Sequence, residues 1–189
     1  MSSEITSCAS AWRHMTKLSE QGPVRNFVQT LDMSDYVVET PLFPKAVLET
    51  YSAWNMGQEI SAAQAAHKTD QRGGLQGDYR DGMAAKIDNV VDCLTAFPES
   101  KRAVISISNN PAPEHASDAD AKCLREIHLH LDNDKLNGTM LLRAQAASIF
   151  PKNIHFVGSI MTEVARRLPQ QPSLGHMFYL ATLLVSDRG

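Results

Sequence analysis

Three side chains in the C-terminal half of the chain have groups that suit chemistry on a phosphorylated ligand. Cys123 has a thiol, which becomes a nucleophile when it loses its proton. Arg143 stands twenty residues later, and its planar guanidinium fits the oxygens of a phosphate dianion. Asn153 has a hydrogen-bond acceptor and donors on one amide. Together these groups would anchor a phosphate and bring the rest of the ligand to a thiol.

Each of these residues also has an ordinary structural role open to it. Cys123 borders a segment of alternating polar and apolar residues, where a cysteine is often part of the core. Arg143 would end a predicted strand, and an arginine there can simply face solvent. Asn153 closely follows Pro151, and asparagine is a common N-cap of helices. The chemical and structural roles both stay open.

The sequence predicts neither a metal site nor disulfides. His128 and His130 form a His-x-His pair that can ligate a metal, but the sequence places no third ligand beside them. The cysteines are odd in number and lack Cys-x-x-Cys spacing, so they predict neither a disulfide framework nor a zinc site. In a reducing compartment, each cysteine would be a small core residue or a reactive thiol.

The elements that would position these groups form the second half of the chain. Residues 124–131 alternate as in a strand, and residues 135–143 are predicted to return beside them as a hairpin. One face of the first strand is predicted to carry Cys123, Arg125, Ile127, Leu129 and Leu131. Further predicted elements are a strand at 103–108, a helix at 155–168 and a strand at 177–186.

The first half is predicted to be mainly helical, with a weak signal over residues 1–40 apart from a helix at 11–20. A second helix begins at Pro44 and ends near Gly57, because apolar residues recur there at helical spacing. An exposed loop is predicted at 69–82 and an amphipathic helix at 84–96. Helices combined with a hairpin-containing sheet indicate a single α+β domain over residues 1–189.

Composition excludes several classes of protein. The chain has 189 residues, 43% of them hydrophobic, which suits one compact domain. A net charge of −3 gives no electrostatic footprint for duplex nucleic acid. No run reaches the roughly 18 apolar residues of a membrane span. The N-terminus has neither a basic nor an apolar targeting region, so we expect a cytoplasmic protein.

Several motifs together resemble the thymidylate synthase superfamily, which includes the pyrimidine-nucleotide hydroxymethylases. Residues 97–109 (FPESKRAVISISN) are similar to the family's Pro-x-Ser-Arg-Arg motif and the strand after it. Cys123 precedes a hairpin that ends in Arg143, as the family's nucleophilic cysteine precedes its phosphate-binding arginine. Asn153 falls on the asparagine that reads the pyrimidine base. The resemblance covers residues 44–57 and 79–186, and residues 1–40 are divergent.

The resemblance implies a mixed or antiparallel sheet packed against helices and a homodimer formed through that sheet. It also implies that Cys123 attacks carbon 6 of a pyrimidine ring, which lets carbon 5 accept a one-carbon unit. The donor in the family is 5,10-methylenetetrahydrofolate. Lys101 and Arg102 match basic residues that reach the neighbouring subunit's phosphate site, although such a pair can also be a solvated edge.

The chain also departs from the family pattern. Thr50 stands where the family has the second of two glutamates, and the remaining candidate carboxylate, Glu49, lies about 100° away around the helix. Ala144 and Ala146 replace a serine and an aspartate that contacts folate and base. The family's final His-x-Tyr pair, which holds the sugar hydroxyl, falls on two other residue types, Val185 and Asp187, and Lys122 replaces a proline.

These matches and departures favour a divergent one-carbon transferase of the superfamily. The leading hypothesis is a hydroxymethylase that acts at carbon 5 of a pyrimidine nucleotide of the CMP, dCMP or UMP type. The alternative is a non-catalytic nucleotide-binding homologue or the partner subunit of a catalytic paralogue. A third possibility is that Cys123 acts on a different acceptor, which the sequence does not identify.

Overall fold

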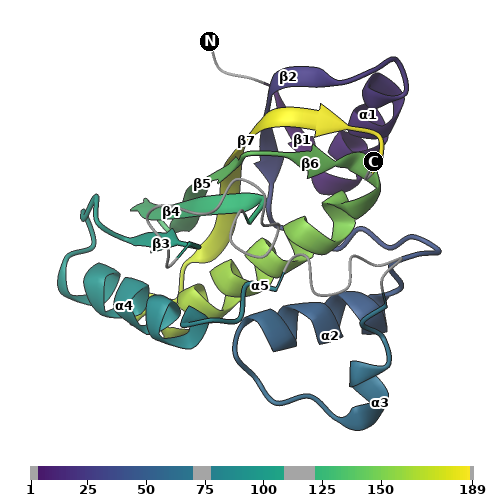
Figure 1. Ribbon diagram of the computed structural model, residues 1–189. Helices are drawn as coiled ribbons and strands as arrows, with labels where there is room; N and C mark the ends of the chain where they lie inside the picture. The colour runs from purple at the N-terminus through teal and green to yellow at the C-terminus, as the bar shows by residue number, and fades with distance from the viewer. Residues whose placement is uncertain (1–3, 70–77, 109–121, 188–189) are drawn as a thin grey trace.

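A mixed seven-stranded sheet forms the centre of the computed structural model, which describes residues 4–69, 78–108 and 122–187. The strand order is β1-β2-β7-β5-β4-β3, with β6 paired to the end of β7 (Figure 1). The strands are β1 (Ile5–Ser7), β2 (Val24–Asp32), β3 (Val104–Ser106), β4 (Leu124–Asp132), β5 (Lys135–Leu142), β6 (Gln145–Ala146) and β7 (Ser173–Val185). Parallel pairs are β1–β2, β5–β7 and β6–β7; β2–β7, β4–β5 and β3–β4 are antiparallel.

Helices pack on the sheet in two tiers. The helices are α1 (Cys8–Ser19), α2 (Lys45–Asn55), α3 (Ala62–Ala65), α4 (Met83–Ala96) and α5 (Phe150–Arg167), with a 3-10 turn, η2, at Ala147–Ile149. Apolar residues of α1, α4 and α5 join the core formed with the sheet. Helix α2 lies against the outer side of α5 (Figure 1). The architecture therefore confirms the predicted α+β class with a mixed sheet packed against helices.

Helix α5 begins five residues earlier than its apolar pattern predicts. Pro151 occupies the first turn, where its missing N–H costs no hydrogen bond, and Ile149 is the N-cap. The apolar stripe of the helix includes Val157, Ile160 and Val164, all fully buried. Because the helix starts at Phe150, Asn153 lies inside it and is not its N-cap.

Strand β4 corrects one sequence expectation. A β-bulge between Leu124 and Glu126 shifts the pairing with β5, so Leu124 and Ile127 both face the core and are fully buried. The prediction that Cys123 and Arg125 share a face with Ile127 is therefore wrong. Simple alternation fails because the bulge adds one residue to the strand.

The bounds of the other helices and strands agree with prediction to different degrees. Helix α2 ends where expected, because Gly57 follows it with a φ of +88°, a conformation that glycine adopts without strain. Strands β1 and β2 lie in residues 1–40, where the sequence pattern predicts no strand. Of the predicted loop at 69–82, residues 70–77 lie outside the described residues. In the described part of the chain, no helix combines the length and apolar character of a membrane span.

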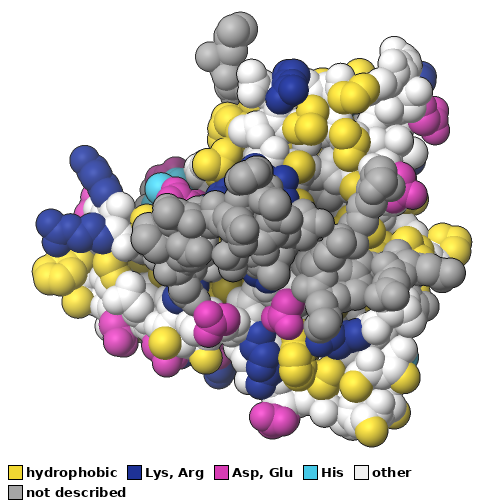
Figure 2. Space-filling model, viewed as in Figure 1, with side chains coloured by type: hydrophobic (Ala, Val, Ile, Leu, Met, Phe, Trp, Pro, Cys, Tyr) yellow, Lys and Arg dark blue, Asp and Glu magenta, His cyan; other side chains and the backbone are white. Residues whose placement is uncertain are grey.

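Figure 2 shows basic and acidic side chains close together in several places on the viewed face. This mixture agrees with the net charge of −3. A ligand on this face would therefore lie near positively and negatively charged side chains at the same time.

Candidate active site around Cys123

The β4–β5 hairpin brings Cys123 and Arg143 side by side. The backbone N–H of Arg143 donates to the carbonyl oxygen of Cys123 over 2.9 Å, just beyond the paired ends of the two strands. Cys123 is a half-buried free thiol, and Arg143 is exposed. The twenty-residue spacing therefore corresponds to direct neighbours across a hairpin.

A buried group of polar side chains contains Asn153. The Asn153 amide donates from Nδ2 to Gln145 Oε1 over 3.0 Å, and the Tyr179 hydroxyl donates to the same oxygen over 3.0 Å. Gln145 in turn donates from Nε2 to the carbonyl oxygen of Ala146 over 2.6 Å. Because Gln145 accepts twice through Oε1, it holds the Asn153 amide with Nδ2 towards it and Oδ1 directed elsewhere.

Cys123 lies near this buried group. Burial raises the pKa of Tyr179 well above its ordinary value, and the nearby charges of Tyr79 and Cys123 raise it further. The Tyr79 hydroxyl accepts a hydrogen bond from the backbone N–H of Leu124, the residue after Cys123, over 3.4 Å. The Tyr79 ring stacks on Phe156 of α5, with 5.6 Å between ring centroids. Tyr79 therefore connects the backbone next to Cys123 to helix α5.

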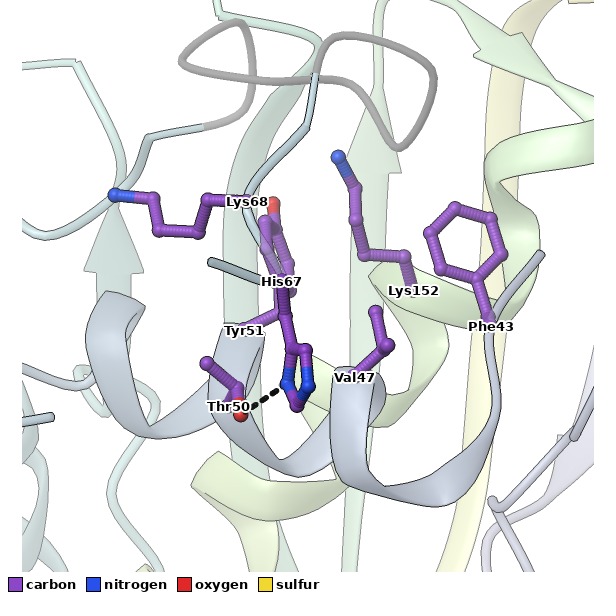
Figure 3. A pocket seen from close by; sticks show the side chains of 7 residues that line it. All are labelled: Phe43, Val47, Thr50, Tyr51, His67, Lys68 and Lys152. Atoms are coloured by element: carbon purple, nitrogen blue, oxygen red, sulfur yellow. Dashed lines mark hydrogen bonds between the residues drawn. The ribbon is translucent and has the colours of Figure 1, made fainter. Parts of the chain in front are cut away.

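A small pocket lies between α2 and the start of α5 (Figure 3). It is lined by Phe43, Val47, Thr50, Tyr51, His67, Lys68 and Lys152. The Lys152 side chain is only 2% exposed, and its ammonium lies 4.4 Å from the centroid of the Tyr51 ring. The Lys68 ammonium points away from the other side chains of Figure 3 and lies over the Trp54 ring. The pocket thus combines apolar walls with one deeply placed cation.

Thr50 faces this pocket from the inner side of α2. Its hydroxyl donates to the carbonyl oxygen of Ala46 over 2.7 Å and lies 3.3 Å from His67 Nδ1 (Figure 3). A threonine hydroxyl bound to its own helix in this way cannot supply the negative charge of a carboxylate. The threonine that stands where a glutamate was expected therefore occupies a buried position in the wall of this pocket.

Three other predicted site residues are not brought to Cys123 within one protomer. Glu49 lies about 100° around α2 from Thr50, is 56% exposed and forms a 3.8 Å ion pair with Lys45. Lys101 and Arg102 are exposed in the turn before β3. Their predicted role requires a second subunit, so it stays a prediction.

Sequence reasoning missed Tyr79, Gln145, Lys152 and Tyr179. Lys152 carries a signal, because a lysine directly after the apolar residues Ile149, Phe150 and Pro151 stands out. Gln145 and Tyr179 carry none, since their partnership depends on the pairing of β6 with β7. Within residues 4–69, 78–108 and 122–187, no group of three or more His, Cys, Asp or Glu side chains is placed to hold a metal ion.

Comparison with known proteins adds no relative to this picture: no family model and no curated protein matches the chain. The chemistry of the site therefore has to be inferred from its own residues.

Proposed function

We propose that this protein is a divergent, thymidylate synthase-like one-carbon transferase, most directly a hydroxymethylase acting at carbon 5 of a pyrimidine nucleotide. The observation that supports the proposal is the arrangement of Cys123, Arg143 and Asn153. A backbone hydrogen bond holds the first two side by side, and Tyr179 and Gln145 link the third to the surroundings of the thiol. A phosphate-binding fork, a nucleophile and an amide would thereby contact one nucleotide.

In this proposal the Cys123 thiolate adds to carbon 6 of the ring and forms a C–S bond. The electron pair of the ring double bond moves to carbon 5, which becomes a nucleophile. Arg143 holds the phosphate, and Asn153 contacts the base edge through the amide oxygen that Gln145 leaves available. Carbon 5 then bonds a solvent proton or, in the full reaction, the one-carbon unit. When carbon 5 afterwards loses its original proton, the double bond reforms and the Cys123 thiolate leaves.

The residues present do not fit the family's usual folate contacts. Ala144 and Ala146 offer only methyl groups where the family has a serine and an aspartate. Addition of Cys123 to carbon 6, followed by exchange of the C5 proton with solvent, needs no folate. The arrangement of Cys123, Arg143 and Asn153 supports this folate-independent exchange of the C5 proton. Whether 5,10-methylenetetrahydrofolate is used is decided by comparing tritium release with and without it.

The test measures release of tritium from carbon 5 of labelled UMP, CMP, dUMP and dCMP, with and without 5,10-methylenetetrahydrofolate. We expect release from at least one nucleotide, and a loss of at least about 10³-fold in Cys123→Ser. Cys93→Ser is the matched control, because Cys93 is also a free, partly buried thiol but lies in α4. No release from any nucleotide, or release that survives in Cys123→Ser, would contradict the proposal.

The alternative function is a non-catalytic nucleotide-binding homologue or a partner subunit. The observation that favours it is Thr50, because its bound hydroxyl leaves the inner side of α2 without the family's carboxylate. A nucleotide at about a hundredfold excess over its Kd should still stabilise the fold by about 2–3 kcal/mol. Arg143→Ala should remove this shift while Arg13→Ala retains it. Binding without tritium release supports the alternative, and turnover by the isolated protein eliminates it.

The proposal includes a homodimer formed through the face of the sheet opposite the core. Val28, Leu180 and Leu141 form one row across β2, β7 and β5 on this face. Phe178 in the next row is 40% exposed, and Val28 is 39% exposed. A second copy would cover these apolar side chains, and its own Lys101 and Arg102 would then reach the phosphate site of the first copy.

A further inference from the structure

A second concave site lies on the other side of α2 from the pocket of Figure 3. This groove, called here the α2–α5 groove, has a volume of about 530 Å³. From α2 and its C-cap residue it is lined by Lys45, Glu49, Ser52, Ala53 and Met56. From α5 it is lined by His155, Ser159, Thr162 and Glu163. Both sets follow helical spacing, so each is one continuous stripe of its helix, and the groove runs between the two stripes.

Tyr36 forms the third wall of the groove and depends on a glycine. A Cβ atom at Gly158 would lie 2.2 Å from Cγ of the Tyr36 ring, so only glycine lets the ring rest against α5. The Tyr36 hydroxyl lies 3.1 Å from the Thr162 hydroxyl, which itself donates to the carbonyl oxygen of Gly158. The Tyr36 ring also meets the His155 ring edge to face at 5.5 Å. The wall is thus fixed by packing and by hydrogen bonds.

His155 offers the groove a hydrogen-bond donor. Its Nδ1 lies 2.7 Å from the Ser52 hydroxyl, and both side chains are at most 5% exposed. The Ser52 hydroxyl proton has no other acceptor within the described structure, so Ser52 donates to Nδ1. The Ser159 hydroxyl donates to the His155 carbonyl oxygen instead. With Ser52 as the donor to Nδ1, the ring proton of His155 lies on Nε2, for which the described residues offer no hydrogen-bond partner.

Lys45 is the positively charged side chain that lines the groove and acts on His155, and the groove also carries the carboxylates of Glu49 and Glu163. Burial, and then the charge of Lys45, lower the pKa of His155 to about 4, so the ring is neutral near pH 7. Lys45 is 65% exposed, and its ion pair with Glu49 is long, at 3.8 Å. The Lys45 ammonium can therefore move towards a ligand in the groove. Glu163 is already bound by Arg166 through contacts of 2.8 and 3.1 Å, which offset its charge.

We propose that the α2–α5 groove binds a small organic oxyanion, a carboxylate or a phosphate. Its oxygen accepts from His155 Nε2–H and contacts the Lys45 ammonium, while its apolar part packs on Val37, Ala53 and Met56. A buried neutral donor beside a mobile cation suits an oxygen with negative charge, since charge-assisted hydrogen bonds are the stronger ones. This site is independent of Cys123 and of the function proposed above.

The experiment uses the full chain labelled with ¹⁵N-histidine and follows both ring nitrogens of His155 by NMR. The unliganded protein should show the Nε2–H tautomer. Benzoate and phenyl phosphate are the probes, and benzyl alcohol is the neutral control. We expect at least one anion to shift His155 Nε2 saturably, whereas benzyl alcohol does not. The anion that binds identifies the class: benzoate a carboxylate, phenyl phosphate a phosphate, both an oxyanion in general.

Variants of two exposed lysines then identify which side chain contacts the bound anion. Lys45→Met should weaken the anion about tenfold, and Lys17→Met, an exposed lysine on α1, should leave the affinity unchanged. Cys123→Ser should bind the probe as the natural chain does. The proposal is overturned by an Nδ1–H tautomer, by absence of a saturable shift with both anions, by an equal response to benzyl alcohol, or by equal weakening in Lys17→Met.

Discussion

The three cysteine thiols differ in their exposure to solvent, and chemical modification can test this difference for each residue. Cys8 is fully buried, and burial together with the charges of Asp32 and Asp35 raises the pKa of its thiol to about 12. Iodoacetamide at pH 8 should therefore modify Cys123 and spare Cys8 in the folded protein, as read by peptide mass spectrometry. Unfolded protein, the control, should react at all three cysteines. Equal rates at Cys8 and Cys123 in the folded protein would contradict the prediction.

His155 predicts a pH dependence of stability. Its pKa falls from 6.5 to about 4 on folding, so the unfolded chain binds more protons between these values. The free energy of unfolding should therefore drop as pH falls from about 6.5 to about 4, by up to roughly 3 kcal/mol from this group. Urea unfolding at pH 7 and pH 4.5 measures the drop.

The control for this pH effect is His130→Gln, since His130 is on an exposed part of β4. It should keep the natural pH dependence, whereas His155→Gln should lose part of it. Where His155→Gln does not fold, the ring nitrogens of His155 can be titrated by NMR in the natural chain. A midpoint near 6.5 there would show that the burial argument is wrong.

The candidate site was predictable at the residue scale only where the partners are close in the chain. The spacing of Cys123 and Arg143 suits a hairpin, and a hairpin forces the two together. Asn153 was identified, but not the contact that orients it. Gln145 and Tyr179 meet only because β6 pairs with the distant β7, and no local pattern records that pairing.

At the scale of the elements, hydrophobic periodicity predicted α4, α5 and the β4–β5 hairpin, because each buries one regular face. It failed at the β4 bulge, since one extra residue reverses the alternation before Glu126. It gave no signal for β2, whose side chains alternate only partly between core and solvent. The neighbours of a strand decide which of its residues are buried, and those neighbours lie far away in the sequence.

The close approach of β4, β5 and β7 at Gly138 gives a prediction at this scale. A Cβ there would lie 2.8 Å from the His128 carbonyl oxygen and 2.8 Å from Met177 Cε. Gly138→Ala should lower the free energy of unfolding by about 1–3 kcal/mol, because backbone must move to make room. Thr139→Ala, on the opposite face, should cost less than about 1 kcal/mol. Equal losses in urea unfolding would contradict this explanation.

For the whole molecule, the uncovered face of the sheet predicts self-association. Phe178 lies at the centre of this face, and a glutamate there would place a charge within the proposed interface. Light scattering should find a dimer for the natural chain and a monomer for Phe178→Glu. Phe97→Glu is the matched control, because Phe97 is a 67% exposed aromatic residue just after α4. A monomeric natural chain would rule out the proposed dimer.

The pairing of β2 with β7 has a consequence for the order of events during synthesis. Strand β2 hydrogen-bonds along its whole length to a strand made roughly 140 residues later, and its other neighbour, β1, has only three residues. Until the ribosome has released β7, β2 therefore has no full-length partner and presents an open edge to other chains. The β4–β5 hairpin, by contrast, can form as soon as it emerges, so the half that carries Cys123 and Arg143 can acquire structure before β2 does.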